Sequence, residues 1–469
     1  MLLDHQNFYL VGIKGVGMTS LAQLLAQAQK NVQGSDVAEN FPTQEILDEL
    51  GLKIDIGFKH DLPTNIDCVI YSGANGGSQN KQVLQAVERG VAAFSHAEAL
   101  GEVFNLKQGI AVCGASGKST TSAMLAFLTS KLGQPQSYSV GVGRIGGLDD
   151  VGHWQKNAPY FIAEADEYAE DPTAQSKKAR FLYLKPYVTI CTNLAFDHPD
   201  VYEDFDHTQK TFGQFFEQIK EDGYLIINGN NEALFNLAKQ VTMSRDISLV
   251  TFGQGEGVDF QIINYEIEDG LSTTTFKYQN QQYEFNLNLP GIFNAYNALA
   301  ALAVLTTLGF DLEKCCQLIA DYKSIKRRFE FLGEKSGVLY YDDYAHHPQE
   351  IASTIRAISE WFPKRRIVIA FQPHTYSRTK MLFNEFVSVF ADADEIVMTD
   401  IFASAREEKD IAVSTDKLVE ALQKKYPQKK ITNLHDNKNL ADFATKNLQP
   451  GNVIISLGAG DIYKFFDLI

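Results

Sequence analysis

The 469-residue sequence contains no apolar run long enough to cross a membrane, and no basic, cleavable leader precedes its first strand-like segment, Phe8 to Val11. We therefore expect a cytoplasmic chain with no membrane partner. It has five cysteines, an odd number, and none of them forms a Cys-x-x-Cys pair. This pattern favours small buried thiols in a reducing compartment over a disulfide framework.

Positive charge is also scarce, because 42 Lys and Arg residues face 58 Asp and Glu residues, for a formal net charge of −16. An acidic chain repels phosphate backbones at long range, so a nucleic acid is not expected as a partner. A local basic pocket for a small phosphorylated ligand remains compatible with this charge. At about 150 residues per domain, the length predicts roughly three domains.

Short apolar strands alternate with helical stretches, which predicts an α/β chain of three domains, each built on a mostly parallel sheet. A strand runs into a special loop at Phe8–Met18, after Gly109–Gly114 and at Arg366–His374, and each is expected to begin its own sheet. The predicted domains are 1–106, Rossmann-like; 107–325, a P-loop ATPase; and 326–469, again Rossmann-like. Residues 259–289 alternate polar and apolar side chains, which predicts antiparallel strands appended to the middle domain.

The first loop, Gly12-Ile13-Lys14-Gly15-Val16-Gly17-Met18, follows a strand and opens a helix. Glycines let a backbone approach phosphate closely, and a helix N-terminus offers free N–H groups to the anion. Lys14 stands where the dinucleotide fingerprint has its middle glycine, which weakens an NAD interpretation. Asp36 follows the next strand and could accept a hydrogen bond from a sugar or a base. A tight turn without any ligand is the alternative.

The second loop, Gly114-Ala115-Ser116-Gly117-Lys118-Ser119-Thr120-Thr121, lies between an apolar strand and a helix. The backbone of such a loop cradles phosphates, its lysine neutralises their charge, and the hydroxyl that follows binds Mg²⁺. Two acidic clusters come after later strands, at residues 164–168 and 197–200. Strand ends in an open α/β sheet face its ligand, so these clusters predict a metal site beside the loop.

Nine segments occur in order over nearly the whole chain, and together they resemble the Mur ligases, which build peptidoglycan precursors. They are the Gly12–Met18 loop with Gly34-Ser35-Asp36, GKSTT (117–121), EADEY (164–168), TNLAFDHPD (192–200), LPGIFNAYNALAA (289–301), RRFEFLGE (327–334), DDYAHHPQE (342–350), FQPHTYSRT (371–379) and DIFASARE (400–407). Within the family they are most similar to the branch that joins L-alanine to UDP-N-acetylmuramic acid with ATP.

The resemblance implies a role for each matching position. The UDP-sugar would bind at Gly12, Lys14, Gly15, Val16, Gly17, Met18, Ser35, Asp36 and Ser72. ATP would bind at Gly114, Ala115, Ser116, Gly117, Lys118, Ser119, Thr120, Asn294 and Asn297, with Arg327 or Arg328 and Asp342 or Asp343 from the third domain. Mg²⁺ would be held by Ser119, Glu164 and His198. The acceptor side would comprise His374, Arg378, Ser404 and Arg406, with His346 or His347 as the proton acceptor.

Some positions depart from the family pattern. Ala115, Ser116 and Ser119 replace Thr, His and Thr of the usual phosphate loop, although Ser119 keeps the hydroxyl that a metal needs. Ala345 stands where glycine is usual, and residues 169–179 are an insertion that resembles the branch ligating a recycled murein tripeptide. That branch is the alternative inside the family. Outside the family there are two alternatives. A dehydrogenase would not explain the second loop, and a non-synthetic P-loop ATPase would not explain the first loop.

Overall fold

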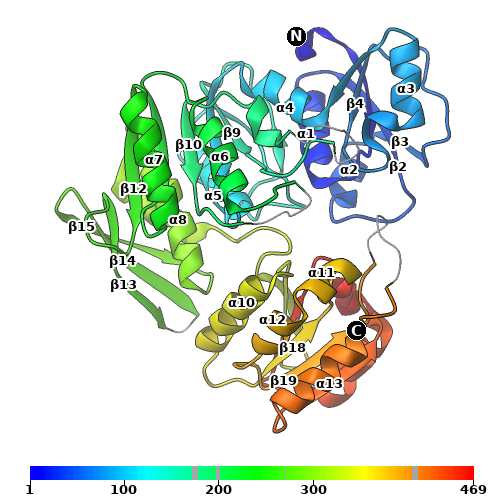
Figure 1. Ribbon diagram of the computed structural model, residues 1–469, viewed down its shortest axis with the longest axis vertical. Coiled ribbons are helices and arrows are strands. Elements are labelled where there is room, and N and C mark those ends of the chain that lie inside the picture. The colour runs from blue at the N-terminus through cyan, green and yellow to red at the C-terminus, as the bar shows by residue number, and fades with distance from the viewer. Residues whose placement is uncertain (172–177, 197–200, 269, 404–409) are drawn as a thin grey trace. The chain divides into compact units, whose positions relative to one another are not determined.

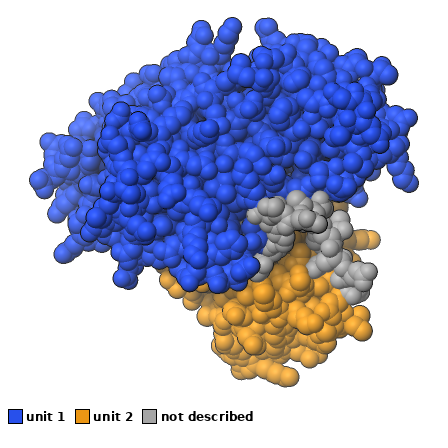
Figure 2. All heavy atoms as spheres, turned by 45° about the horizontal axis from the view of Figure 1, so that its top comes forward, with its two compact units in different colours: residues 1–265, 273–287, 293–323 blue, residues 266–272, 288–292, 324–469 orange. Residues whose placement is uncertain are grey.

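The computed structural model describes residues 1–171, 178–196, 201–268, 270–403 and 410–469. Three sheets follow one another along the chain, each flanked by helices, so the predicted α/β architecture of three mostly parallel sheets is confirmed (Figure 1). The chain folds into two compact units (Figure 2). Unit 1 comprises 1–265, 273–287 and 293–323, and unit 2 comprises 266–272, 288–292 and 324–469. The predicted limits of the three domains stay a prediction.

The first sheet has the order β3-β2-β1-β4-β5, and all its neighbouring strands are parallel. Its strands are β1 (Asn7–Val11), β2 (Asn31–Asp36), β3 (Lys53–Ile56), β4 (Cys68–Tyr71) and β5 (Ala92–Ser95). Its helices are α1 (Val16–Gln27), α2 (Gln44–Glu49), α3 (Lys81–Glu88) and α4 (His96–Phe104). The strand order reverses beside β1, and ligands of open α/β sheets bind at such a switch point.

The second sheet has the order β15-β14-β13-β12-β11-β10-β6-β9-β7-β8. Its strands are β6 (Gln108–Cys113), β7 (Gln136–Ser139), β8 (Gly152–His153), β9 (Tyr160–Glu164), β10 (Val188–Cys191), β11 (Gly223–Asn228), β12 (Ile247–Gly253), β13 (Phe260–Glu268), β14 (Leu271–Tyr278) and β15 (Gln281–Leu287). Its helices are α5 (Lys118–Lys131), α6 (Phe205–Phe216), α7 (Glu232–Ser244), α8 (Ile292–Thr307) and α9 (Leu312–Leu318). Strands β13, β14 and β15 occupy the stretch 259–289, where strands appended to the middle domain were predicted, and they extend this sheet.

Helix α8 begins five residues before the start, Asn297, that its Ala- and Leu-rich stretch predicts. The extra turn contains Asn294 and Tyr296, whose polarity hides it from a search for apolar periodicity. Both Asn294 and Asn297 are buried. Residues three apart lie on one helix face, so the two amides are placed together.

The third sheet has the order β16-β17-β21-β18-β19-β20. Its strands are β16 (Glu330–Lys335), β17 (Val338–Asp343), β18 (Ile367–Phe371), β19 (Glu395–Thr399), β20 (Lys430–His435) and β21 (Val453–Leu457), and its helices are α10 (Pro348–Trp361), α11 (Tyr376–Met381), α12 (Phe383–Ser388), α13 (Thr415–Lys425) and α14 (Asn437–Asn447). The expectation that β18 begins this sheet is wrong. The hairpin β16–β17 precedes it, and β16, only half buried along an edge, carries a weak apolar signal.

Inside unit 1, helix α1 lies against the second sheet. The amide oxygen of Gln23 accepts hydrogen bonds from the N–H groups of Val151 (2.9 Å) and Gly152 (3.0 Å), and its NH₂ group donates to Asp150 (2.7 Å). A Cβ atom on Gly152 would lie 1.8 Å from the carbonyl oxygen of Ser20, so the backbones approach closely here. These interactions fix the first loop relative to the second sheet.

Two expectations about bulk properties can be compared with this fold. All five cysteines are buried and free, which confirms the prediction of buried thiols. Among the helices that the structure describes, none is both long and apolar enough to span a bilayer.

Within unit 2, Arg327 joins the hairpin to the end of β21. The guanidinium is 6% exposed; its Nε donates to Asp342 (2.9 Å), and its two terminal nitrogens donate to the carbonyls of Gly460 (2.8 Å) and Gly458 (2.7 Å). The planar fork of arginine satisfies all three partners at once, which a lysine cannot do.

We therefore expect Arg327→Lys to lower the free energy of unfolding by about 3 kcal/mol, because a buried charge network is broken. Urea denaturation followed by circular dichroism measures the change. Arg366→Lys is the matched control, since Arg366 pairs with Glu395 but is 40% exposed, and about 1 kcal/mol or less is expected there. Equal effects of the two substitutions would contradict the structural role of Arg327.

Candidate active site

The phosphate-type loop leaves β6 and enters α5 at Lys118. Gly114 and Gly117 have positive φ angles of +126° and +84°. A Cβ atom on Gly114 would lie 2.2 Å from the hydroxyl of Thr192, and one on Gly117 would lie 2.4 Å from the amide oxygen of Asn297. Both glycines are needed on grounds of conformation and of space.

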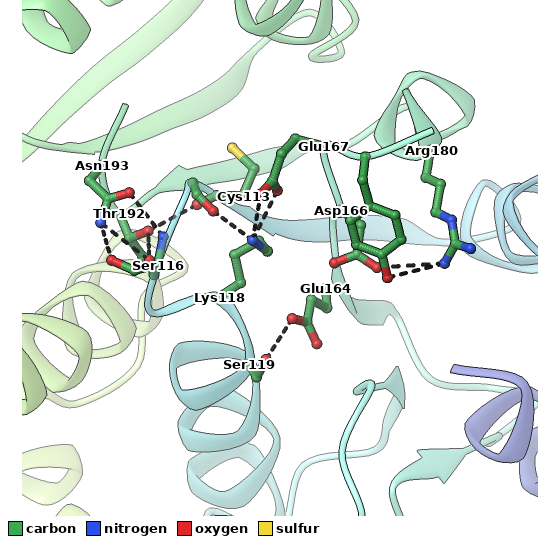
Figure 3. Close-up of polar contacts among 12 residues, drawn as sticks. Cys113, Ser116, Lys118, Ser119, Glu164, Asp166, Glu167, Arg180, Thr192 and Asn193 are labelled. Atoms are coloured by element: carbon green, nitrogen blue, oxygen red, sulfur yellow. Dashed lines mark hydrogen bonds and ion pairs between the residues drawn. The ribbon is translucent and has the colours of Figure 1, made fainter. Parts of the chain in front are cut away.

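The end of β10 holds this loop in place (Figure 3). Thr192 donates its hydroxyl to the carbonyl of Ser116 (2.5 Å), while the amide group of Asn193 accepts from the Ser116 N–H (3.1 Å) and donates to its hydroxyl (2.6 Å). The sequence analysis did not propose Thr192 or Asn193 as site residues. Both residues directly follow a predicted strand of the same sheet as the glycine loop, and this position could have identified them as site residues from the sequence.

Lys118 is the first residue of α5, and its side chain is 11% exposed. The ammonium group donates to the carbonyl of Gly114 (2.8 Å) and pairs with Glu167 (2.9 Å). Burial alone would lower the pKa of Lys118, but the carboxylates of Glu167, Asp166 and Glu164 outweigh it and raise this pKa above the ordinary value. The lysine is therefore charged, as a group that neutralises phosphate must be.

Ser119 and Glu164 face each other beside the lysine. The Ser119 hydroxyl donates to one oxygen of Glu164 (2.6 Å), and the N–H of Gly141 donates to the other (3.2 Å). Burial, together with the charge of Asp166, raises the pKa of Glu164 to about 7. An opposite charge placed here would lower that pKa again, so the carboxyl group is suited to receive a cation.

A magnesium ion fits these donors, since it prefers hard oxygen ligands and keeps several waters or phosphate oxygens. Ser119 and Glu164 would hold it from the protein side. His198, the third predicted ligand, lies outside the described residues. Across the part of the chain that the structure describes, no three His, Cys, Asp or Glu residues gather into a metal-binding group.

Helix α8 completes one wall of the loop. The amide oxygen of Asn297 lies 3.3 Å from the hydroxyl of Thr121, next to Gly117, and Asn294 is buried on the same helix face. Ala115 is half buried and Thr120 is buried. The roles predicted for Ala115, Thr120, Asn294 and Asn297 as ATP contacts stay predictions.

The first loop turns sharply after β1. Gly12 has a φ angle of +84°, its N–H donates to the carbonyl of Ser35 (2.9 Å), and a Cβ atom on it would meet the hydroxyl of Ser72 at 2.5 Å. The ends of β1, β2 and β4 therefore meet, as the predicted grouping of Gly12, Ser35 and Ser72 requires.

The side chain of Lys14 points into the protein and not toward a ligand. It is 3% exposed and donates to the carbonyls of Val37 (3.0 Å) and Glu39 (2.9 Å). Asp36 accepts from the N–H of Lys14 (2.7 Å) and of Val37 (2.8 Å), and burial raises the pKa of Asp36. Both side chains shape the loop, and the roles predicted for Lys14 and Asp36 in binding a UDP-sugar stay predictions.

The two loops open toward the same place in unit 1. A Cβ atom on Gly141 would lie 3.3 Å from a carboxylate oxygen of Glu164 and 3.7 Å from a methyl group of Val16. Val16, at the start of α1, is 38% exposed, whereas Met18 is buried. The start of α1 therefore lies close to the carboxylate of Glu164.

In unit 2, three of the residues predicted for the acceptor side gather. The rings of His346 and His374 are 6.1 Å apart, and Arg378 lies 3.5 Å from Nδ1 of His374. His347 differs, because its ring accepts from the N–H of Gln349 and caps helix α10. Ser404 and Arg406 lie outside the described residues.

Only one ring nitrogen of His346 is occupied by a hydrogen bond, which leaves the other able to accept a proton. Its Nδ1 lies 2.9 Å from the carbonyl of Tyr344, which fixes that nitrogen as the donor and leaves Nε2 as the acceptor. Burial lowers the pKa of His346, although the Glu350 carboxylate opposes the shift. The ring is consequently neutral near pH 7. Of the two histidines left open by the sequence, the geometry favours His346.

The alternatives Arg327 or Arg328 can be weighed in the same way. The guanidinium of Arg327 is already used inside unit 2, which favours Arg328 as the cation that reaches a nucleotide. Asp343 accepts from the N–H groups of Phe329 and Ala345, both at 2.8 Å. Burial raises the pKa of Asp343 to about 6, against the charge of Arg328.

Comparison with protein families gives three matches along the chain. Residues 7–108 match the Mur ligase family catalytic domain, 112–305 the Mur ligase middle domain, and 327–460 the Mur ligase glutamate ligase domain. The UDP-N-acetylmuramate–L-alanine ligase of Desulfitobacterium hafniense is 34% identical over 98% of both chains. The enzyme of the same name from Clostridium perfringens is 34% identical over 99% of this chain and 97% of its own.

Solved structures show the same fold. The UDP-N-acetylmuramate–alanine ligase of Thermotoga maritima superposes with a TM-score of 0.82 at 24% identity, covering 99% of this chain and 98% of that one. A murein peptide ligase from Psychrobacter arcticus gives 0.70 at 21% identity, with the same coverage. The identity to the first two relatives extends over nearly the full length of both sequences, and the chain belongs to the Mur ligase family.

Proposed function

We propose that this protein uses ATP to join L-alanine to the carboxylate of UDP-N-acetylmuramic acid, a step in peptidoglycan precursor synthesis. The observation that carries the proposal is the convergence of the first loop and the phosphate-type loop on Ser119 and Glu164 within unit 1. A sugar-linked acid on one loop and a nucleotide on the other would meet there. The names of the full-length relatives support the choice of substrates.

The reaction needs activation because a carboxylate repels nucleophiles and its oxygen is a poor leaving group. Transfer of the γ-phosphoryl group of ATP to that carboxylate makes an acyl phosphate, in which phosphate is a good leaving group. The transferring group carries spread negative charge, so catalysis consists mainly of positioning and cationic stabilisation. Attack by the amine of alanine then forms the amide bond and releases phosphate.

Residues of unit 1 would carry the first half of this sequence. Lys118 would exchange Glu167 for the β- and γ-phosphates, and the Gly114–Gly117 backbone would donate N–H groups to them. Ser119 and Glu164 would hold Mg²⁺, which would supply positive charge to offset the negative charge of the phosphates. The first loop would orient the sugar nucleotide through its backbone at the N-terminus of α1.

Residues of unit 2 would serve the acceptor. The amine must arrive neutral, and the free Nε2 of a neutral His346 can accept its proton. Arg378 can bind the alanine carboxylate with two parallel hydrogen bonds. His374 stacks on Phe402 and lies between the other two groups, so it would hold them in position.

The second candidate is ligation of a murein tripeptide to the same sugar nucleotide. One observation favours it: the sequence resemblance identifies residues 169–179 as an insertion shared with that branch, and Ala169 pairs with Ala179 in an antiparallel bridge. The insertion belongs to unit 1, whereas the acceptor residues belong to unit 2. We therefore give more weight to the acceptor residues.

A first test concerns the phosphate-binding lysine. Lys118→Ala removes the cation that offsets charge on the transferring phosphoryl group, a contact worth about 3–4 kcal/mol in such transition states. We expect phosphate release in the presence of both substrates to fall about 100-fold to 1,000-fold. The control is Lys131→Ala at the other end of α5, which should keep full activity. A folded Lys118→Ala protein with near-normal turnover would refute the assignment.

A second test concerns the metal site. Glu164→Gln keeps the shape of the side chain but removes its charge, so the magnesium concentration giving half-maximal rate should rise at least about 10-fold. Magnesium titration of the ligation rate measures it. Glu232→Gln, an exposed change at the start of α7, should leave the requirement unaltered. An unchanged requirement in Glu164→Gln would remove this residue from the site.

A third test decides the substrates. L-alanine and the tripeptide L-Ala-γ-D-Glu-diaminopimelate are allowed to compete for ligation to UDP-N-acetylmuramic acid. The sugar nucleotide carries oxygen-18 in its carboxylate, so that the fate of that oxygen can be followed in the same reaction. We expect L-alanine to be ligated faster, with glycine and serine as slow substrates, because one methylene changes binding by only about 1–3 kcal/mol. Label should appear in the released phosphate, as the acyl-phosphate route requires.

The possible outcomes separate the parts of the proposal. Faster ligation of the tripeptide would replace L-alanine as the acceptor while the ligase reaction stands. Label retained wholly in the amide product would exclude the acyl phosphate. ATP hydrolysis that needs no sugar nucleotide would overturn the ligase function altogether.

A further inference from the structure

A buried histidine without a hydrogen-bond partner lies beside the first loop. His96 is the first residue of helix α4 and is 7% exposed. Neither of its ring nitrogens has a partner at full hydrogen-bond geometry among the described residues, although the Gly17 backbone is close enough to act weakly on the ring. Its ring packs against Gly17: a Cβ atom on that glycine would lie 2.9 Å from Nε2 and 3.0 Å from Cε1. His96 is not among the site residues predicted from the sequence.

Two unpaired nitrogens in a buried ring are costly, because each has lost its water without gaining a protein partner. Folded proteins retain such groups mainly where a ligand supplies the missing bond. Burial and the charge of Arg180 lower the pKa of His96 to about 3, against a smaller opposing effect of the Gly17 backbone. The ring is therefore neutral under ordinary conditions and offers one N–H donor and one acceptor.

The groups around the His96 ring favour a negatively charged ligand. The first helical hydrogen bond of α1 runs from the N–H of Thr19 to the carbonyl of Gly15 (2.8 Å), so the N–H groups of Val16, Gly17 and Met18 have no partner within the helix. A helix start of this kind attracts negative charge. Arg180 adds positive charge near His96, although Asp166 lies 4.0 Å from it and offsets part of that charge.

We infer that His96 binds the diphosphate of a nucleoside-diphosphate sugar held at the start of α1, by donating its ring N–H to a phosphate oxygen; this inference rests on the proposed function. The open N–H groups of Val16, Gly17 and Met18 would bind the same anion from the helix side. Gly17 is part of the arrangement, because any side chain there would displace the imidazole ring. His96 is a binding residue and takes no part in the transfer of protons or phosphate.

The test compares His96→Leu with the wild type. Leucine is of similar size but cannot donate, so the dissociation constants of UDP-N-acetylmuramic acid and of UDP, measured by calorimetry, should both rise about 10-fold to 100-fold. The affinity for ATP should not change. The unfolding temperature without ligand should be equal or higher, because an unsatisfied polar group has been removed. Gly17→Ala should weaken UDP binding in the same way, and His5→Leu, before β1, should not.

Each outcome has one meaning. Wild-type affinity for both uridine ligands in His96→Leu overturns the inference and leaves the proposed function standing. Weaker binding together with a lower unfolding temperature assigns His96 a structural role and also overturns it. A wild-type protein that binds no uridine diphosphate sugar would remove the proposed function itself, and this inference with it.

Discussion

The ion pair between Lys118 and Glu167 sets the electrostatics of the whole nucleotide site. A buried ammonium group needs a partner, and the end of β9 supplies three carboxylates for one lysine. When phosphates take over the lysine, the remaining carboxylates are left with excess negative charge. A divalent cation would offset that excess, so the proposed metal and the proposed nucleotide would stabilise each other in this site. Burial, with a smaller contribution from the charge of Asp166, raises the pKa of Glu164 to about 7 before any ligand arrives.

The close approach of helix α1 to the second sheet fixes which part of unit 1 lies next to the carboxylate of Glu164. Gln23 links α1 to the strand pair β7–β8 through hydrogen bonds to Val151 and Gly152, so the first loop cannot drift from the second sheet. The start of α1 consequently faces the Glu164 carboxylate across Gly141. Positioning of this kind lowers a barrier because the reacting groups no longer lose freedom of motion at the moment of reaction. Unit 1 thus brings together the lysine, the hydroxyl group and the carboxylates to which we assign the activation of the acid.

Much of this could be predicted from local sequence, because glycine loops between strand and helix carry their function in a few consecutive residues. The phosphate-type loop and the strand-end carboxylates were found in this way. The partners that hold them were not: Thr192 and Asn193 reach Ser116 across more than 70 residues, and only the parallel pairing of β6 with β10 brings them together. Composition likewise cannot show that Lys14 turns inward, since its partners are backbone carbonyls.

The assignment of acid activation to unit 1 and of the acceptor residues to unit 2 has an evolutionary consequence. In the proposed reaction the two halves share only the activated carboxyl group, and each unit has its own hydrophobic core. Mutations around His374 and Arg378 can therefore accumulate without disturbing the phosphate-type loop of unit 1. New amino-acid or peptide acceptors can be recruited by modular change in unit 2, while the activating half is inherited intact.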